Sequence, residues 1–579
     1  MSKYSFDTVS SVYMRRSKLD QSHRVKTSMR VGDLVPIDVR EVLPGDNWTC
    51  REGHLVRLST SYLRPIMDQV FMDVYEFFVP LRLLYDDYES VFGNASPNAY
   101  VQEDLGSFPI IEKEIDIVSK SVGDYLGLPL GLLPSGISLL KFRGFALIYD
   151  EWFRNENTVS PMLVQKGEWS SVSEVPNGEP WSPSNYMGML PKVGKKNDYF
   201  TSGLPSPQKG SPVTLPIGSF SDVPVAPDKG SHSAISIGSF VSASPSYAFA
   251  NLNKGNTIGK VDLLSNPYAL VATPIGRLQT YVGEDVDFGF SESSFGTDNL
   301  VPTNLWAKTS VLSNSLTAVD VNDLRFAFQL QKMLEKDARG GGRYREYLLT
   351  HYGVNNADAR MQIPEFLGGR RTPLNLQQVA QTSAGTDDSP LAALGGYSQT
   401  LDRSSYRKAF TEHGYIYTVA CIRYKHSYQQ GIDKSWFRSS RNDFYDPLFA
   451  NLGEQPVYLS QIYGMASANV DADGNSSLKA HGFNYQEAWA DYRYAPDIVT
   501  GQMRSGAEYS FDIYHFADLY SNAPSFTQDF TDENSAFFRR ATSAGSDAGV
   551  DDFLVDFYFD CYAYRVMPVR SIPGLVDHH

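Results

Sequence analysis

The residue types that carry out catalysis form no familiar pattern in this chain of 579 residues. The nucleophile elbow Gly-x-Ser-x-Gly, the zinc-binding pattern His-Glu-x-x-His and the phosphate loop Gly-x4-Gly-Lys-Ser/Thr are all absent from the sequence. Gly340, Gly341 and Gly342 precede a predicted helix, but they lack the lysine and the preceding strand of a phosphate loop. A tight turn between two helices is therefore the better interpretation of these glycines.

Candidate acid–base groups are equally isolated. Glu412 and His413 could supply an acid and a base, yet no third group can be assigned to them, and we favour a surface or hydrogen-bonded core histidine. The acidic pairs are adjacent in sequence, and adjacent side chains of a strand point to opposite faces, which does not suit paired catalytic carboxylates. The adjacent acidic pairs are Asp86–Asp87, Asp387–Asp388 and Asp551–Asp552. The sequence therefore predicts no enzyme, no cofactor and no metal site.

Basic residues are concentrated near the N-terminus, although the whole chain has a formal charge of −15. Residues 1–30 hold seven basic side chains against Asp7 and Asp20, a local charge of +5. A short basic arm on an acidic body suits contact with a polyanion, while a solvated tail remains the alternative. The candidate nucleic-acid contacts are Arg15, Arg16, Lys18, Arg24, Lys26 and Arg30.

The elements that must position these residues are mainly strands. Residues 552–567 alternate with a period of two, with Phe553, Val555 and Phe557 on one face and Leu554, Asp556 and Tyr558 on the other. Residues 70–79 and 415–424 show the same alternation. Because strand and helix do not alternate regularly along the chain, a doubly wound α/β fold is disfavoured. We predict an all-β, antiparallel sandwich with long inserted loops and a few helices.

Helices are a minority, predicted at 139–155, 322–338 and 344–352, with Asn322 as an N-cap and Gly340 and Gly353 as stops. The apolar stripes of the first two helices, such as Leu324, Ala327 and Phe328 in the second, are expected to be core contacts.

Residues 219–300 differ in character from the rest of the chain. In 221–245, twelve of twenty-five residues are Gly, Pro or Ser, although Val, Ile and Phe recur among them. We interpret 219–300 as an insertion that projects from the body and is partly ordered by neighbouring subunits, with a disordered linker as the alternative.

The remaining composition is that of an ordinary globular chain, with 42% apolar and 20% charged residues. Cys50, Cys421 and Cys561 are far apart, and we expect neither a disulfide framework nor a Cys-x-x-Cys metal pair. No apolar secretory region and no run of about 18 apolar residues are present, so we expect no membrane insertion and folding in a reducing compartment.

A set of motifs in one order resembles the major capsid proteins of microviruses, in the gokushovirus branch of single-stranded DNA bacteriophages. The resemblance runs from about residue 5 to the C-terminus, apart from 219–300. Relatives often carry Trp where this chain has Tyr85, and Thr where it has Gly342. The motifs are VGDLVPIDVREVLPGD (31–46), FFVPLR (77–82), DYFTSGLPSPQKG (198–210), LEKDARGGGRYREYLLTHYGV (334–354), PEFLGG (364–369), EHGYI (412–416), YQQGIDKSWFRSSRNDFYDPLFANLGEQPV (428–457) and SIPGLVDHH (571–579).

This resemblance implies an eight-stranded antiparallel jelly roll that assembles with its own copies into a T=1 icosahedral shell around single-stranded DNA. It divides the chain into a basic arm (1–30), a first body part (31–218), a variable protrusion (219–300) and a second body part (301–579). It also implies a small basic DNA-binding protein, a pilot protein, an internal scaffolding protein and a host surface receptor as partners, with assembly in the bacterial host cytoplasm. Candidate host-attachment residues in the protrusion are Asp228, Lys229, His232, Phe240, Tyr247 and Phe249.

Two other classes of function remain open from the residues alone. A β-rich carbohydrate-active enzyme would need a concave pocket with carboxylates of perturbed pKa. A phage adhesin would form elongated trimers, yet the sequence contains no internal repeat.

Overall fold

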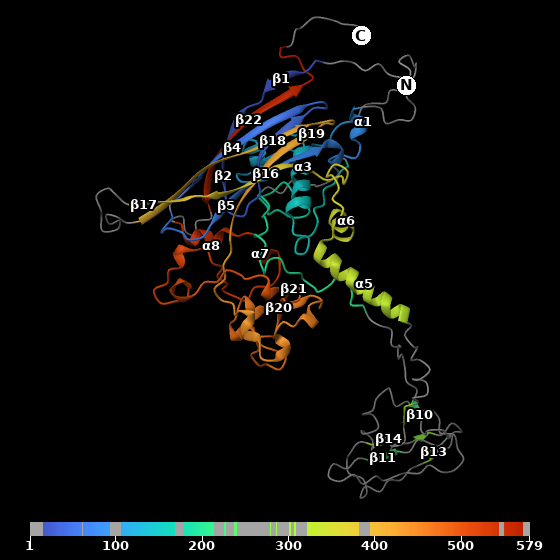
Figure 1. Ribbon diagram of the computed structural model, residues 1–579. Helices are drawn as coiled ribbons and strands as arrows, with labels where there is room; N and C mark the ends of the chain where they lie inside the picture. Colours follow the sequence, from blue (N-terminus) through green and yellow to red (C-terminus); the bar gives the residue numbers. More distant parts are fainter. Residues whose placement is uncertain are drawn as a thin grey trace. The chain divides into compact units, whose positions relative to one another are not determined.

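A computed structural model describes residues 15–60, 62–92, 106–167, 178–213, 321–380, 394–542 and 549–570, together with short strands between 225 and 307 (Figure 1). The chain divides into two compact units, residues 1–210 with 334–579 and residues 211–333. In the second unit, short strands pair antiparallel: β10 (Val225–Ala226) with β15 (Trp306–Ala307), β11 (Ile237–Ser239) with β14 (Leu300–Pro302), and β12 (Leu278–Gln279) with β13 (Asp285–Val286).

The larger sheet of the first unit has six strands in the order β1-β22-β4-β18-β17, and β2 also pairs with β22. All of its pairings are antiparallel, and β22 lies against β4 although about 500 residues separate them. These strands are β1 (Ser17–Asp20), β2 (His23–Met29), β4 (Asn47–Leu58), β17 (Leu376–Ala380), β18 (Leu394–Ala409) and β22 (Phe553–Arg565).

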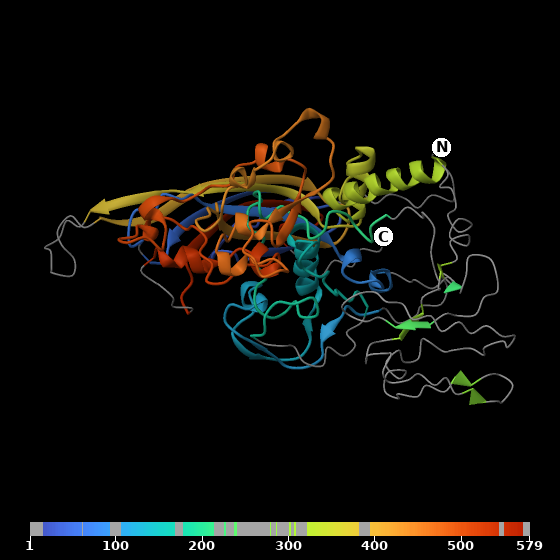
Figure 2. The same cartoon turned by 90° about the horizontal axis from the view of Figure 1, so that it is seen from below.

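The second large sheet has four antiparallel strands in the order β16-β5-β19-β3. They are β3 (Val35–Val42), β5 (Val70–Pro80), β16 (Glu365–Leu374) and β19 (Gly414–Tyr424). Most side chains of β5 and β19 are buried whichever face they point to, so this sheet is covered on both sides. One cover is α3 (Leu140–Ile148) (Figures 1 and 2). Tyr417 of β19 donates a hydrogen bond to the Lys141 carbonyl of this helix at 2.9 Å.

The two sheets share one hydrophobic core. Val56 and Phe557 of the six-stranded sheet belong to the same buried cluster as Val74, Phe78 and Ile416 of the four-stranded sheet. The three sequence-predicted strands are confirmed as β22, β5 and β19, and β22 buries the predicted apolar face. The predicted all-β, antiparallel class is confirmed in this coarse form.

The remaining strands of the first unit have two to five residues each. Two hairpin-like pairs, β6 (Ile110–Ile111) with β9 (Ile137–Ser138) and β7 (Ile115–Ile117) with β8 (Gly131–Leu133), precede α3, and β20 (Gln455–Tyr458) pairs with β21 (Gly482–Gln486). The other helices are α1 (Tyr88–Phe92), α2 (Val122–Tyr125), α5 (Val321–Gly340), α6 (Tyr344–Tyr352), α7 (Gln528–Thr531) and α8 (Ser535–Arg540).

The predicted helices form, but one predicted burial is wrong. The helix expected at 139–155 is α3 followed by a π-helical turn at Tyr149–Phe153, and those expected at 322–338 and 344–352 are α5 and α6. The apolar stripe of α5 is not a core contact, because Phe328 is 58% exposed. The buried residue of this helix is Ala338, near its C-terminal end. Periodicity marks an apolar face, whereas burial also requires another element to pack against it.

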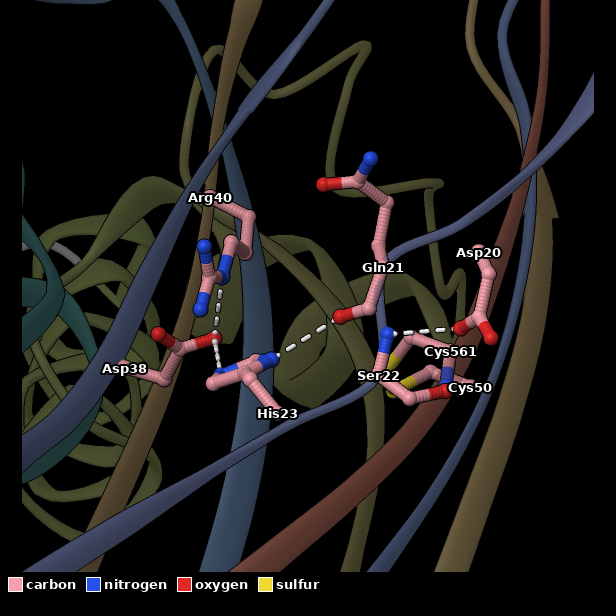
Figure 3. Close-up of a disulfide and its surroundings, with 8 residues drawn as sticks. All are labelled: Asp20, Gln21, Ser22, His23, Asp38, Arg40, Cys50 and Cys561. Atoms are coloured by element: carbon pink, nitrogen blue, oxygen red, sulfur yellow. Dashed lines mark hydrogen bonds and ion pairs between the residues drawn. A yellow bond between two sulfur atoms is a disulfide. The ribbon is translucent and has the colours of Figure 1, made fainter.

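We expected no disulfide framework from the spacing of the cysteines, and the structure contains one disulfide among the described residues. Cys50 of β4 and Cys561 of β22 lie directly opposite each other and are joined, while Cys421 is buried and free (Figure 3). Beside them, Ser22 in the turn between β1 and β2 accepts a hydrogen bond from the Cys561 amide at 3.3 Å. The partners are 511 residues apart in sequence, so their spacing could not reveal the pairing.

Candidate nucleic-acid interface

Among the described residues, the side chains on one face of the six-stranded sheet are exposed or half-buried along β4 and β22. Strict alternation along β22 places Phe553, Phe557 and Phe559 in the core and leaves Leu554 and Tyr558 outside, with Tyr558 45% exposed. Residues directly opposite in neighbouring strands share a face, so the ladder registers define what gathers on the outer face.

Basic side chains dominate this outer face. Arg24 of β2 lies opposite Tyr558, and Arg403 of β18 lies opposite Gly53 in the same row. Ser405 and Arg51 form the next row with Asp560, and Arg407 lies opposite Thr49. Among the described outward-facing residues of β1, β2, β4, β18 and β22, seven are basic and three are acidic. The basic residues are Lys18, Arg24, Lys26, Arg51, Arg57, Arg403 and Arg407, and the acidic ones are Asp20, Asp556 and Asp560.

Tyrosines lie between these cations. Lys18 Nζ lies 3.8 Å from the centre of the Tyr562 ring, and the Arg24 guanidinium lies 5.3 Å from that of Tyr558. The carboxylates of Asp560 and Asp20 raise the pKa of Tyr562 above its ordinary value. Guanidinium and ammonium groups bind phosphates, and neutral aromatic rings stack on unpaired bases.

The structure places the sequence-predicted contacts in two groups. Arg15 and Arg16 are exposed just before β1, and Lys18, Arg24 and Lys26 lie on the outer face of the sheet. Arg30 lies beyond β2 and is ion-paired with Asp551 at 2.9 Å, so it does not belong to this face. The candidate attachment residues Asp228, Lys229, His232, Phe240, Tyr247 and Phe249 lie outside the described residues.

Sequence reasoning missed the four arginines that complete the face. Arg51 and Arg57 in β4, and Arg403 and Arg407 in β18, are separated by even numbers of residues, which places each pair on one face of its strand. That spacing was a usable signal. The pairing of β4 with both β18 and β22, which brings the arginines and tyrosines together, is not visible in local sequence.

The groups considered for catalysis are engaged elsewhere. Glu412 is ion-paired with Arg82 at 2.8 Å, whereas the His413 ring stacks on Phe92 with 4.2 Å between ring centres. The amide of Gly342 donates to the Glu156 carboxylate at 2.7 Å, so a carboxylate occupies the site that resembled a phosphate cradle.

A cavity of about 680 Å³ lies between β5, the turn after α3 and the segment joining α5 to α6. Its lining carboxylates are Glu156 and Glu346, and each accepts a backbone hydrogen bond, from Gly342 and Arg343 respectively. They therefore do not form a free acid–base pair. Within the described part of the chain, no group of three metal-ligating side chains occurs, and no helix is long and apolar enough to cross a membrane.

Other buried ionisable groups link elements of the body. His426 lies between Asp518 at 2.7 Å and Glu533 at 3.0 Å, and Lys195 contacts Asp518 at 2.9 Å. Burial opposes protonation of His426, but the two carboxylates raise its pKa to about 9. In the core, burial and the nearby Glu52 raise the pKa of Glu76 to about 7.

Known proteins match nearly the whole chain. The family model described as "Capsid protein (F protein)" matches residues 7–575. The chain is 35% identical to capsid protein VP1 of Spiroplasma virus 4, over 99% of this chain and 97% of the relative. It is 34% identical to capsid protein VP1 of Chlamydia phage 1 and 33% identical to that of Bdellovibrio phage phiMH2K, each over 99% of this chain and 98% of the relative.

Proposed function

Because this chain belongs to the capsid protein (F protein) family, and is thus a structural protein of the virion and not an enzyme, we propose that its shell is a T=1 icosahedron enclosing single-stranded DNA. The resemblance found in the sequence motifs is confirmed by the family match over residues 7–575. Self-assembly into a capsid shell follows from membership of this family.

We propose that the body is an eight-stranded jelly roll built from β2, β3, β4, β5, β16, β18, β19 and β22. The strand orders β2-β22-β4-β18 and β3-β19-β5-β16 support this assignment. Consecutive strands from β2 to β5 alternate between the two sheets, as Greek-key connections require.

We propose that the outer face of the six-stranded sheet lines the interior of the shell and contacts DNA phosphates without reading base sequence. The observation that carries this proposal is the excess of cations, interleaved with tyrosines, on one face of a chain whose total charge is −15. A shell interior must neutralise a packaged polyanion, while an acidic exterior keeps particles apart in solution.

The domain plan and the partners remain part of the proposal. Residues 219–300 would form an outward protrusion for attachment to a host receptor, and residues 1–30 would continue the interior basic surface. A small basic DNA-binding protein, a pilot protein and an internal scaffolding protein complete the expected set of partners.

Electron microscopy of particles assembled from the purified chain tests the proposal. We expect closed shells of T=1 symmetry in which Arg51 and Arg403 face inward, and an outward-facing arginine sheet would contradict the interior assignment. Genome content gives a second test, because particles carrying Arg15→Ala, Arg16→Ala and Lys18→Ala together should package less DNA than wild type. A normal amount of DNA in them would refute a role for the N-terminal segment.

A further inference from the structure

The segment between β19 and β20 displays large apolar side chains to solvent. Leu448 is 88% exposed and Trp436 is 78% exposed, although both belong to regular 3-10 turns, at Pro447–Phe449 and Lys434–Phe437. Six large side chains, each between 42% and 88% exposed, define what we call the aromatic surface. It consists of Trp436, Phe444, Tyr445, Leu448, Phe449 and Tyr492.

Side-chain hydrogen bonds hold these turns in place. Asp433 accepts from the Ser435 amide at 2.8 Å, and Asp446 accepts from the Leu448 amide at 2.9 Å. Between them, Asp443 accepts from the amides of Ser440 and Ser439 at 2.8 and 3.0 Å, and these bonds lower the pKa of its carboxyl group. The segment is therefore ordered before any partner binds, which reduces the entropy lost on association.

The aromatic surface is also anchored from beneath. Trp489 is buried and donates its indole N–H to the Phe449 carbonyl at 2.9 Å. The Tyr445 ring lies 5.7 Å from that of Trp489 and 6.2 Å from that of Tyr492. The Arg438 guanidinium, ion-paired with Asp491, lies 4.3 Å from the centre of the Tyr492 ring. These contacts join Tyr445, Phe449 and Tyr492 into one patch, and Leu448 lies in the same 3-10 turn as Phe449.

The exposed area of this patch matches what one partner supplies to a stable interface. An aromatic side chain covers roughly 200 Å², so six large side chains exposed by 42–88% offer about 700 Å², close to the ~800 Å² per partner of a standard interface. Tyrosine, tryptophan and arginine are the types enriched in the energetic centres of interfaces. A monomer that stayed alone would gain nothing from holding them in solvent.

We propose that the aromatic surface is a contact between subunits, and that its occupant is a second copy of this chain. The proposal rests on the proposed function, since assembly of a shell requires each copy to present surfaces that its neighbours cover. The patch contains no acidic or basic majority, as suits an interface buried by apolar contact rather than one that binds nucleic acid.

Leu448→Asp tests the proposal, because it places a charge at the most exposed position without removing a contact of the folded monomer. The matched control is Leu132→Asp, a leucine of β8 that is 66% exposed and belongs to neither the aromatic surface nor the outer face of the six-stranded sheet. Particles are counted by sedimentation and electron microscopy, and circular dichroism melting checks folding. We expect particle yield to fall about tenfold or more for Leu448→Asp, with the control unchanged. Trp436→Asp should repeat the loss and decides the matter if Leu448→Asp does not melt like wild type.

The outcomes separate this proposal from the proposed function. Wild-type chain that forms no shells would refute the proposed function itself. Wild-type shells together with normal yields from both Leu448→Asp and Trp436→Asp would refute only the subunit contact. Normal particle yield with lost infectivity would assign the aromatic surface to a different partner and would also overturn the proposal.

Discussion

Replacing Arg51 and Arg403 by glutamine should reduce the salt dependence with which the unassembled chain binds single-stranded DNA. Both side chains lie on the outer face of the six-stranded sheet, in adjacent rows of the ladder, and neither is ion-paired within the described part of the chain. Each cation that neutralises a phosphate on a single strand contributes about 0.7 to the slope of log K against log salt concentration.

The magnitude follows from counting cations. If all seven basic groups of the outer face engage phosphates, the wild-type slope is about −5, and removing two reduces its size by about 1.4. Between about 50 mM and about 200 mM salt, wild type should then lose about sevenfold more affinity than the variant does.

Fluorescence anisotropy of a labelled oligothymidine, titrated with the chain at several salt concentrations, measures both slopes. The matched control is Arg64→Gln with Arg360→Gln, two exposed arginines outside this sheet, which changes the net charge by the same amount. We expect the control slope to equal that of wild type. An unchanged slope for the sheet variant, or an equal change in the control, would refute the assignment of DNA to this face.

Further predictions concern stacking and stability. Tyr558→Ala should weaken the same DNA binding by about 1–3 kcal/mol while leaving the salt slope unchanged. Glu76→Gln should raise the free energy of unfolding by about 3 kcal/mol at about pH 8 and change it little at about pH 4. The reason is that the folded chain loses stability as pH rises from 4.5, the ordinary pKa of this carboxyl group, to about 7, its pKa in the core. Asp518→Asn should lower the free energy of unfolding by about 3–5 kcal/mol, because His426 and Lys195 lose a buried negative partner. In wild type, the stability that protonated His426 contributes should disappear as pH rises through about 9. Urea unfolding across pH measures both effects, and flat profiles would contradict them. In wild type, we expect the oxidised chain to melt at a higher temperature than the reduced chain. Cys50→Ser should abolish this difference in melting temperature.

Local sequence was sufficient for several individual elements. The alternation at 552–567 identifies β22 and its buried face, because successive side chains of a strand point to opposite sides. The helix at 344–352 is bounded by Gly353, whose positive φ of 68° marks the left-handed stop that glycine favours. Ordered motifs from 31 to 579 were enough to identify the family.

Patterns along one strand could not identify its neighbours. Arg51 and Arg403 are about 350 residues apart, and they share a surface because β4 pairs with β18. The same limit hid the Cys50–Cys561 bond and the grouping of His426 with Asp518 and Glu533. It also led to the wrong expectation for Phe328, whose helical stripe predicted a core contact although the side chain is exposed.

The sequence by itself determined which side chains share a face within each strand or helix, the local stops of those elements and the family of the chain. Only the tertiary structure decided which faces meet, and so where cations, tyrosines, sulfurs and buried charges gather. The physical reason is that side-chain direction follows from local backbone geometry, whereas strand pairing is chosen by the burial of apolar surface across hundreds of residues.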